Sequence, residues 1–99
     1  MILVVGTVRA PGGKLAELKG AIETMIAETL KEDGCIRYAF AQDLLDPDVM
    51  HVSEAWRDLD ALKAHGKSAH MADWRAATAD AGMTDRDIRM YTTDEGIAL

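Results

Sequence analysis

The chain has 99 residues, a length that suits a single domain. Eleven Lys and Arg residues against seventeen Asp and Glu residues give a net charge of −6, and the positive residues are scattered along the chain. Because phosphate binding requires clustered positive charge, we expect neither a nucleic acid nor a membrane surface as a partner. The composition, 48% hydrophobic and 28% charged, is that of an ordinary soluble globular domain.

The chain begins with a predicted strand and a predicted helix. Ile2–Arg9 is rich in Val and carries apolar residues on both faces of the strand that it would form. Residues 10–13 include proline and two glycines, which indicates a turn. Lys14–Lys31 then repeats apolar residues at spacings of three and four, which predicts one amphipathic helix. Gly34 is placed to end that helix in a left-handed cap.

Two more strands follow and are joined by a short loop. Cys35–Gln42 is predicted to be a strand. The residues on one of its faces would be Ile36, Tyr38 and Phe40. Asp43–Asp48 has the Asp and Pro residues of a hairpin loop, and Val49–Trp56 returns as the third strand. These two strands should therefore be antiparallel neighbours.

The last part of the chain predicts two helical pieces and a fourth strand. Asp58 is placed to cap the start of a helix. This helix carries Leu59, Leu62 and His65. Residues 66–68, Gly-Lys-Ser, should break it, and Ser68 should cap a second piece that runs through Ala77. Asp87–Thr93 then alternates as a strand, and the complete order is β-α-β-β-α-β.

This order predicts an α+β, ferredoxin-like domain with an antiparallel four-stranded sheet and helices on one face. The helices can cover only that face, whereas Ile2–Arg9 is apolar on both. A chain of this length also buries only about two thirds of its unfolded surface. We therefore expect a homodimer in which the partner covers the second face of the sheet.

The longest apolar run bears on where the protein is located, and the single cysteine bears on which bonds the chain can form. Met1–Val5 is too short for a membrane span or for the core of a signal peptide, so we expect a cytoplasmic protein. Cys35 has no second cysteine with which to form a disulfide or a metal pair. We expect it to be a small buried hydrophobic residue in its strand.

His65 and His70 are the two titratable candidates for chemistry. On a continuous helix, residues five apart point about 140° away from each other, so this pair does not predict a metal site. Histidine is the commonest general base. The alternative for each is a structural histidine that donates to a nearby carbonyl group. Glu54 should be half-buried and should need an ion-pair partner, for which Arg37 and Arg89 are the candidates.

Two motifs resemble those of the antibiotic biosynthesis monooxygenase domain family. One is Glu-x-Trp at residues 54–56, followed by Ala-Leu-x-Ala-His at 61–65 and Ser-x-His at 68–70. The other is Glu-Asp-Gly-Cys-Ile-Arg-Tyr at 32–38. The likeness extends from Val4 to about Tyr91. The family comprises small dimeric ferredoxin-like proteins, quinol monooxygenases among them, whose subunits pack sheet to sheet as a dimeric α+β barrel.

The resemblance implies an activity that needs no metal, flavin or haem. In such proteins a quinol or polycyclic phenol loses a proton, and the electron-rich anion reacts with dioxygen. His65 and His70 match the family's histidines and are the implied catalytic residues. The aromatic residues expected to line an enclosed substrate pocket are Trp74, Tyr38 and Phe40, with packing in the core as the alternative for each, whereas Trp56 is assigned to packing.

Other activities of the same fold are less compatible with the sequence or stay open. The haem-degrading branch uses an asparagine on the first strand, but residues 5–7 are Val-Gly-Thr, and His65 stands where that branch has a tryptophan. Two alternatives to a monooxygenase stay open. One is a dimeric binding or stress-response protein that holds a small aromatic molecule, and the other is a cofactor-free isomerase.

Overall fold

The computed structural model describes residues 1–99 and contains four strands and four helices. The strands are β1 (Ile2–Arg9), β2 (Cys35–Gln42), β3 (Val49–Trp56) and β4 (Thr84–Thr92). The helices are α1 (Lys14–Glu17), α2 (Lys19–Thr29), α3 (Leu59–Gly66) and α4 (Ala69–Thr78). None of them is long and apolar enough to cross a membrane.

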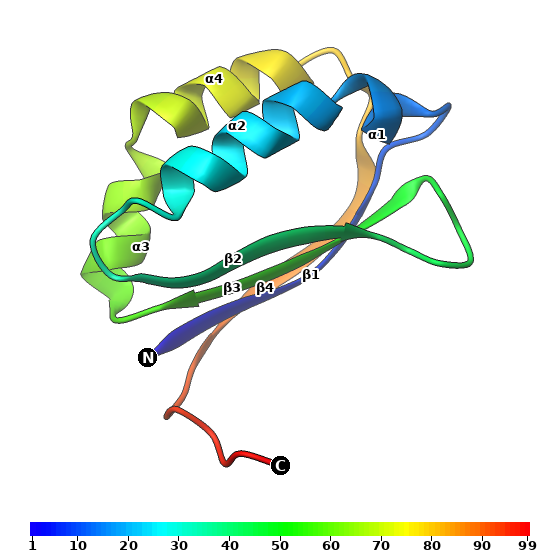
Figure 1. The fold of residues 1–99 in the computed structure, drawn as a ribbon. Helices are drawn as coiled ribbons and strands as arrows, with labels where there is room; N and C mark the ends of the chain where they lie inside the picture. The colour runs from blue at the N-terminus through cyan, green and yellow to red at the C-terminus, as the bar shows by residue number, and fades with distance from the viewer.

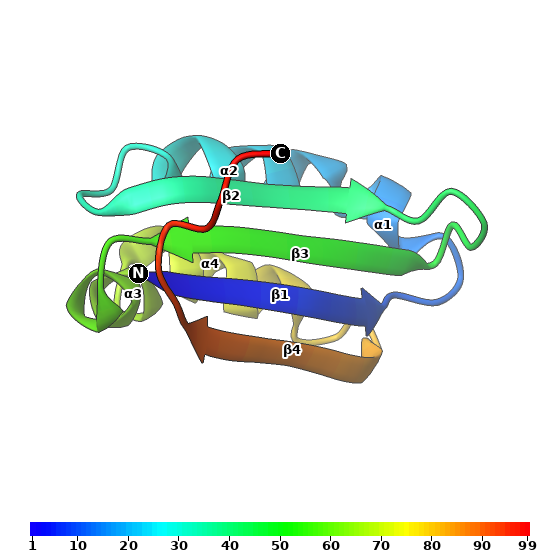
Figure 2. The ribbon, with the colours of Figure 1, turned by 90° about the horizontal axis from the view of Figure 1, so that it is seen from below.

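The four strands form one antiparallel sheet in the order β2-β3-β1-β4. All four helices lie on the same face of this sheet (Figure 1), and the opposite face carries none (Figure 2). Each of the two helical sections consists of two pieces. The predicted α+β, ferredoxin-like β-α-β-β-α-β fold is confirmed.

The core lies between the sheet and the helices. One cluster of buried apolar side chains consists of Ile2, Val4, Met25, Tyr38, Trp56 and Ala61. A second consists of Val8, Ala10, Leu15, Met50 and Val52. Trp56 is fully buried, so its assignment to packing is confirmed. Replacing such a side chain with alanine lowers the free energy of unfolding by about 3–5 kcal/mol, so the site described below lies on a well-packed core.

The first helical section departs from the single helix predicted over Lys14–Lys31. Leu18 has a ψ of −2°, whereas a helix requires about −42°, and it separates α1 from α2. The second helix ends at Thr29, because the N–H groups of Lys31 and Glu32 donate to carbonyls three residues back, those of Glu28 and Thr29, and so tighten the last turn. Gly34 has the predicted left-handed conformation, with a φ of 83°, but it turns the chain into β2 and does not cap the helix.

The start of β2 carries an irregularity that the sequence pattern did not predict. Its pairing with β3 shifts register between Cys35 and Arg37. An extra residue in a strand reverses the alternation of faces. Cys35 therefore packs against the core beside Tyr38, and Ile36 is exposed. The prediction that Ile36 shares a face with Tyr38 and Phe40 is wrong, and Cys35 is partly buried as expected.

The fourth strand begins at Thr84, three residues before the predicted start at Asp87. Residues 84–86 are all polar, so they gave no apolar alternation from which to recognise a strand. Pairing between β1 and β4 is very close at Gly6, which has a φ of 157°. A Cβ atom there would lie 2.0 Å from the carbonyl oxygen of Asp87. Only glycine allows this approach of the two backbones.

The predicted turn and cap residues act as expected. Asp43 Oδ2 accepts hydrogen bonds from the backbone N–H groups of Leu45 and Asp46, both at 3.0 Å, and so orders the hairpin loop. Asp58 Oδ1 accepts from the N–H of Ala61 at 2.8 Å and caps α3.

The outer face of β1 stays uncovered within one chain. Ile2, Val4 and Val8 face the helices and are buried. Leu3 and Val5 alternate with them and face the other way, and Val5 is 39% exposed. The prediction that a second copy covers this face stays a prediction.

Candidate functional site

The site begins at the break between the two helices of the second helical section. His65 lies in the last turn of α3, and His70 lies in the first turn of α4. Ser68 joins the two helices, because its hydroxyl donates to the carbonyl of His65 at 2.7 Å and accepts from the N–H of Met71 at 3.3 Å. The predicted cap at Ser68 is therefore confirmed, and the helix axis changes direction between the histidines.

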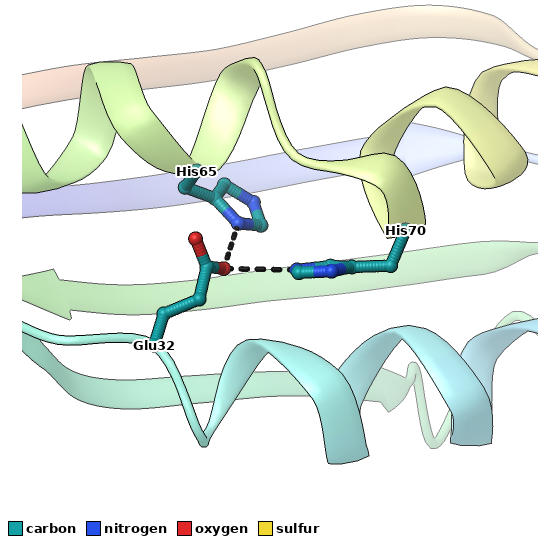
Figure 3. Close-up of side chains that lie close together, drawn as sticks. All are labelled: Glu32, His65 and His70. Carbon is teal, nitrogen blue, oxygen red and sulfur yellow. Dashed lines mark hydrogen bonds and ion pairs between the residues drawn. The ribbon is translucent and has the colours of Figure 1, made fainter.

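Both imidazole rings converge on Glu32, which lies in the turn between α2 and β2 (Figure 3). Glu32 Oε2 lies 2.6 Å from His65 Nδ1 and 2.9 Å from His70 Nε2. The two ring centroids are 5.8 Å apart. The prediction that the histidines point apart is wrong, since it assumed a continuous helix and the helix breaks between them.

The hydrogen bonds to Glu32 determine where the protons of the two rings are. A carboxylate can only accept, so His65 Nδ1 and His70 Nε2 both donate. In the neutral His65 ring, Nε2 then has a free lone pair. The side chain of His65 is only 5% exposed, so this nitrogen lies in a largely dry environment. A histidine held in one tautomer by a carboxylate is the arrangement expected of an oriented general base.

A pocket of about 620 Å³ opens beside His65, between the sheet and the helices. Four of the five predicted site residues line it, namely Tyr38, Phe40, His65 and Trp74. Tyr38 lies 5.1 Å from Phe40 and 5.2 Å from His65, and Phe40 lies 5.8 Å from Trp74, all between ring centroids. His70 borders a smaller hollow on the other side of Trp74. It therefore reaches the pocket only through Glu32 and His65.

Glu54 also lines the pocket, but it does not form the predicted ion pair. Arg37 donates to Ser53 and Arg89 donates to Asp87 instead. Only the indole N–H of Trp56 donates to Glu54, at 2.9 Å. The outward faces of the strands carry both arginines, whereas Glu54 faces the helices. Burial therefore raises the pKa of Glu54 above its ordinary value, partly offset by the Trp56 hydrogen bond.

Tyr38 is a neutral polar group in the same pocket. Burial raises the pKa of its phenol, and the negative charges of Glu54 and Glu32 raise it further. The phenol therefore stays protonated near neutral pH and is able to donate a hydrogen bond. Arg86 lies at the rim and supplies positive charge to the pocket.

Two residues of the site carried no predicted role. Glu32 is the first residue of the motif at 32–38, and that motif was its only signal. Arg86 precedes the predicted start of the last strand, in a polar stretch with no recognisable pattern. Both residues belong to the site only through the three-dimensional placement of the turn after α2 and of the start of β4.

Comparison with known proteins agrees with the resemblance found in the sequence. The family model described as antibiotic biosynthesis monooxygenase matches residues 1–77. The chain is also 26% identical over 94 residues to an uncharacterized protein of Synechocystis sp.. That match covers 95% of this chain but 64% of the relative, so this chain spans less than two thirds of that protein's length.

Solved structures show the same fold. A candidate antibiotic biosynthesis monooxygenase from Deinococcus radiodurans is 27% identical and superposes with a TM-score of 0.88, over 100% of this chain and 98% of that one. A conserved protein from Methanosarcina mazei is 29% identical with a TM-score of 0.82, over 94% of this chain and 92% of that one.

Proposed function

This chain belongs to the antibiotic biosynthesis monooxygenase family, and we propose that it is a cofactor-independent monooxygenase that oxidises a quinol or polycyclic phenol with dioxygen. One observation carries the proposal. His65 is buried on the wall of an apolar pocket, and Glu32 holds it in the tautomer that leaves Nε2 free to accept a proton.

In the proposed reaction, His65 Nε2 accepts the proton of a phenolic hydroxyl group. The resulting anion is electron-rich and transfers electrons directly to dioxygen. One oxygen atom enters the ring, so that a quinol becomes a hydroxylated quinone and a phenol becomes a quinone, and the other oxygen atom leaves as water. The substrate supplies all four electrons, so no outside reductant is required.

The pocket supplies what this reaction needs from a protein. Its volume of about 620 Å³ is within the range of small-molecule sites and would admit one to three fused rings. Tyr38, Phe40 and Trp74 offer aromatic faces to the substrate rings. The protonated Tyr38 hydroxyl and the positive Arg86 are placed to stabilise an anionic oxygen.

The proposal includes a homodimer that buries the outer face of the sheet. Val5 and Leu3 on β1 are apolar and uncovered in one chain, which supports pairing of that face with a second copy. Sedimentation equilibrium at micromolar concentration should give twice the chain mass of 10.8 kDa. A folded monomer across that range would contradict the dimer.

The function is tested by oxygen uptake with a panel of quinols and polycyclic phenols. A monooxygenase should consume one dioxygen per substrate and form a hydroxylated quinone from a quinol, or a quinone from a phenol. If a panel compound binds and is released unchanged, the chain is a binding protein. If the compound is rearranged with no oxygen uptake, the chain is an isomerase. Either result would contradict the proposed activity while leaving the family membership intact.

A further inference from the structure

We propose that Glu32, His65 and His70 form a binding site for one divalent transition-metal ion, with Zn²⁺ as the best-fitting species. The three side chains come from three separate elements, the turn after α2, the end of α3 and the start of α4. Each offers one ligand atom, and these atoms all lie within 4.8 Å of one another. Figure 3 shows the carboxylate between the two rings.

The donor set determines the class of ion. Two imidazole nitrogens and one carboxylate oxygen suit Zn²⁺, Fe²⁺ and their neighbours in the first transition row. Mg²⁺ and Ca²⁺ prefer sites made of oxygen ligands, so they are poor candidates. Three protein ligands also leave at least one coordination position for water or another small ligand.

The surroundings favour a cation. The side chains of Glu32 and His70 are 17% and 16% exposed, so an ion can reach the site and yet lose most of its contact with bulk water. Glu32 carries a negative charge at the centre of the cluster, and the partly buried Glu54 is near enough to interact with it. No Lys or Arg side chain forms an ion pair with Glu32.

Binding requires the three ligand atoms to take up new separations. Ligand atoms about 2.0–2.1 Å from a tetrahedral Zn²⁺ lie roughly 3.3 Å apart, compared with 2.6 and 2.9 Å in this structure. Glu32 lies in the turn after α2, and its carboxylate would have to withdraw by that difference, while the two ring nitrogens, no more than 4.8 Å apart, take up the same spacing. The two protons now between the rings and the carboxylate would move to the opposite nitrogens, His65 Nε2 and His70 Nδ1.

This proton shift has a consequence that rests on the proposed function. With the metal on Nδ1, the neutral His65 ring carries its proton on Nε2 and has no lone pair with which to accept one from the substrate. Zn²⁺ at this site should therefore inhibit cofactor-independent oxidation.

The site is tested by direct binding to the metal-free protein. Isothermal titration with Zn²⁺ should give one ion per chain, and Co²⁺ should give the visible absorption bands of a low-symmetry nitrogen and oxygen site. His70→Asn and Glu32→Gln should each weaken Zn²⁺ binding at least tenfold. Circular dichroism identifies a variant that fails to fold, and the two substitutions are independent of each other.

His51→Ala is the matched control, because His51 also contacts a carboxylate, that of Asp43, but at an exposed position. It should bind Zn²⁺ as the wild-type protein does. The proposal is overturned if the wild-type protein binds no ion, or if His70→Asn and Glu32→Gln fold and bind as tightly as the wild type. Loss of binding in His51→Ala would place the ion at the hairpin.

These results are separate from the test of the proposed function, because binding is measured without any substrate. If no quinol is oxidised but one Zn²⁺ binds, the metal site stands and the monooxygenase proposal fails. If oxidation proceeds and Zn²⁺ at saturating concentration leaves its rate unchanged, the inference that metal binding blocks His65 is overturned.

Discussion

Histidines contact carboxylates at two places in the molecule, one at each end of β2. At the hairpin, His51 Nε2 lies 2.8 Å from Asp43 Oδ1, with side chains 50% and 29% exposed. At the other end, His65 Nδ1 lies 2.6 Å from Glu32, with side chains 5% and 17% exposed. The distances are similar, but only the second contact is sheltered from water and borders an apolar pocket.

The difference shows that a hydrogen bond to a carboxylate does not by itself make a histidine a candidate general base. The ring must also be sheltered from water. Water screens the exposed pair, and such pairs contribute about 0–1 kcal/mol to stability. In the sheltered pair, the carboxylate holds the imidazole ring in one orientation. The low dielectric of the buried site also strengthens the interaction of the ring with a charge next to it. The hairpin pair therefore provides a matched control for each experiment on the site.

The largest expected effect is that of His65→Ala on the proposed oxidation. Loss of a positioned general base should lower kcat by about 10²–10⁴-fold. His51→Ala should leave kcat unchanged. Oxygen uptake with the best quinol measures both, and urea unfolding of each variant separates lost chemistry from lost structure. Equal rates in His65→Ala and the wild type would remove His65 from the mechanism.

A smaller loss is expected when the orienting carboxylate is changed. Glu32→Gln should lower kcat by about tenfold or more, because the amide no longer selects one tautomer of His65. This loss is smaller than that of His65→Ala, since the base itself is still present. KM should change little, since Glu32 does not line the pocket. Asp43→Asn is the control and should change neither constant. A rise in KM with kcat intact would assign Glu32 to substrate binding instead.

The smallest effects concern the pH dependence of stability. Neutralising a buried carboxylate and neutralising an exposed one should change the free energy of unfolding in opposite directions. Burial raises the pKa of Glu54, so its ionised form opposes folding at neutral pH. Glu54→Gln should raise the free energy of unfolding at pH 7, and the gain should fade as the pH falls toward about 4. Urea unfolding across this range measures the difference.

Asp43 should behave in the opposite way. The hydrogen bond from His51 and those from the backbone of Leu45 and Asp46 lower the pKa of Asp43, so its ionised form stabilises the fold. Asp43→Asn should lower the free energy of unfolding at pH 7, and the loss should disappear as the wild type becomes protonated below about pH 4. The same sign for both variants would contradict the assignment of burial as the cause.

Local chemistry accounts for the parts of the fold that the sequence predicted well. The bounds of β2 and β3 follow from Gly34 and from the Asp and Pro residues of 43–48, which act through their own backbone. The caps at Asp58 and Ser68 are equally local. These features need no knowledge of the rest of the molecule.

The features that were missed depend on contacts between distant segments. The register shift at Cys35 arises from pairing with β3, and the polar start of β4 is a strand only because β1 lies beside it. Glu32 and His65 are 33 residues apart, and no periodicity connects them. Their meeting also requires the helix break at 66–68, which the sequence predicts and which places His70 on a separate helix from His65.

The close approach of β1 and β4 at Gly6 determines how the protein tolerates change. Every substitution at residue 6 adds a Cβ atom that would lie 2.0 Å from the carbonyl oxygen of Asp87, so β1 and β4 would have to move apart. At Gly20 and Gly66 the same atom would meet nothing within 4 Å. In a library of single variants selected for solubility, residue 6 should be retained as glycine, while alanine should be accepted at the other two positions. The constraint at residue 6 therefore comes from the backbone of β4, whereas Gly20 and Gly66 have no such neighbour.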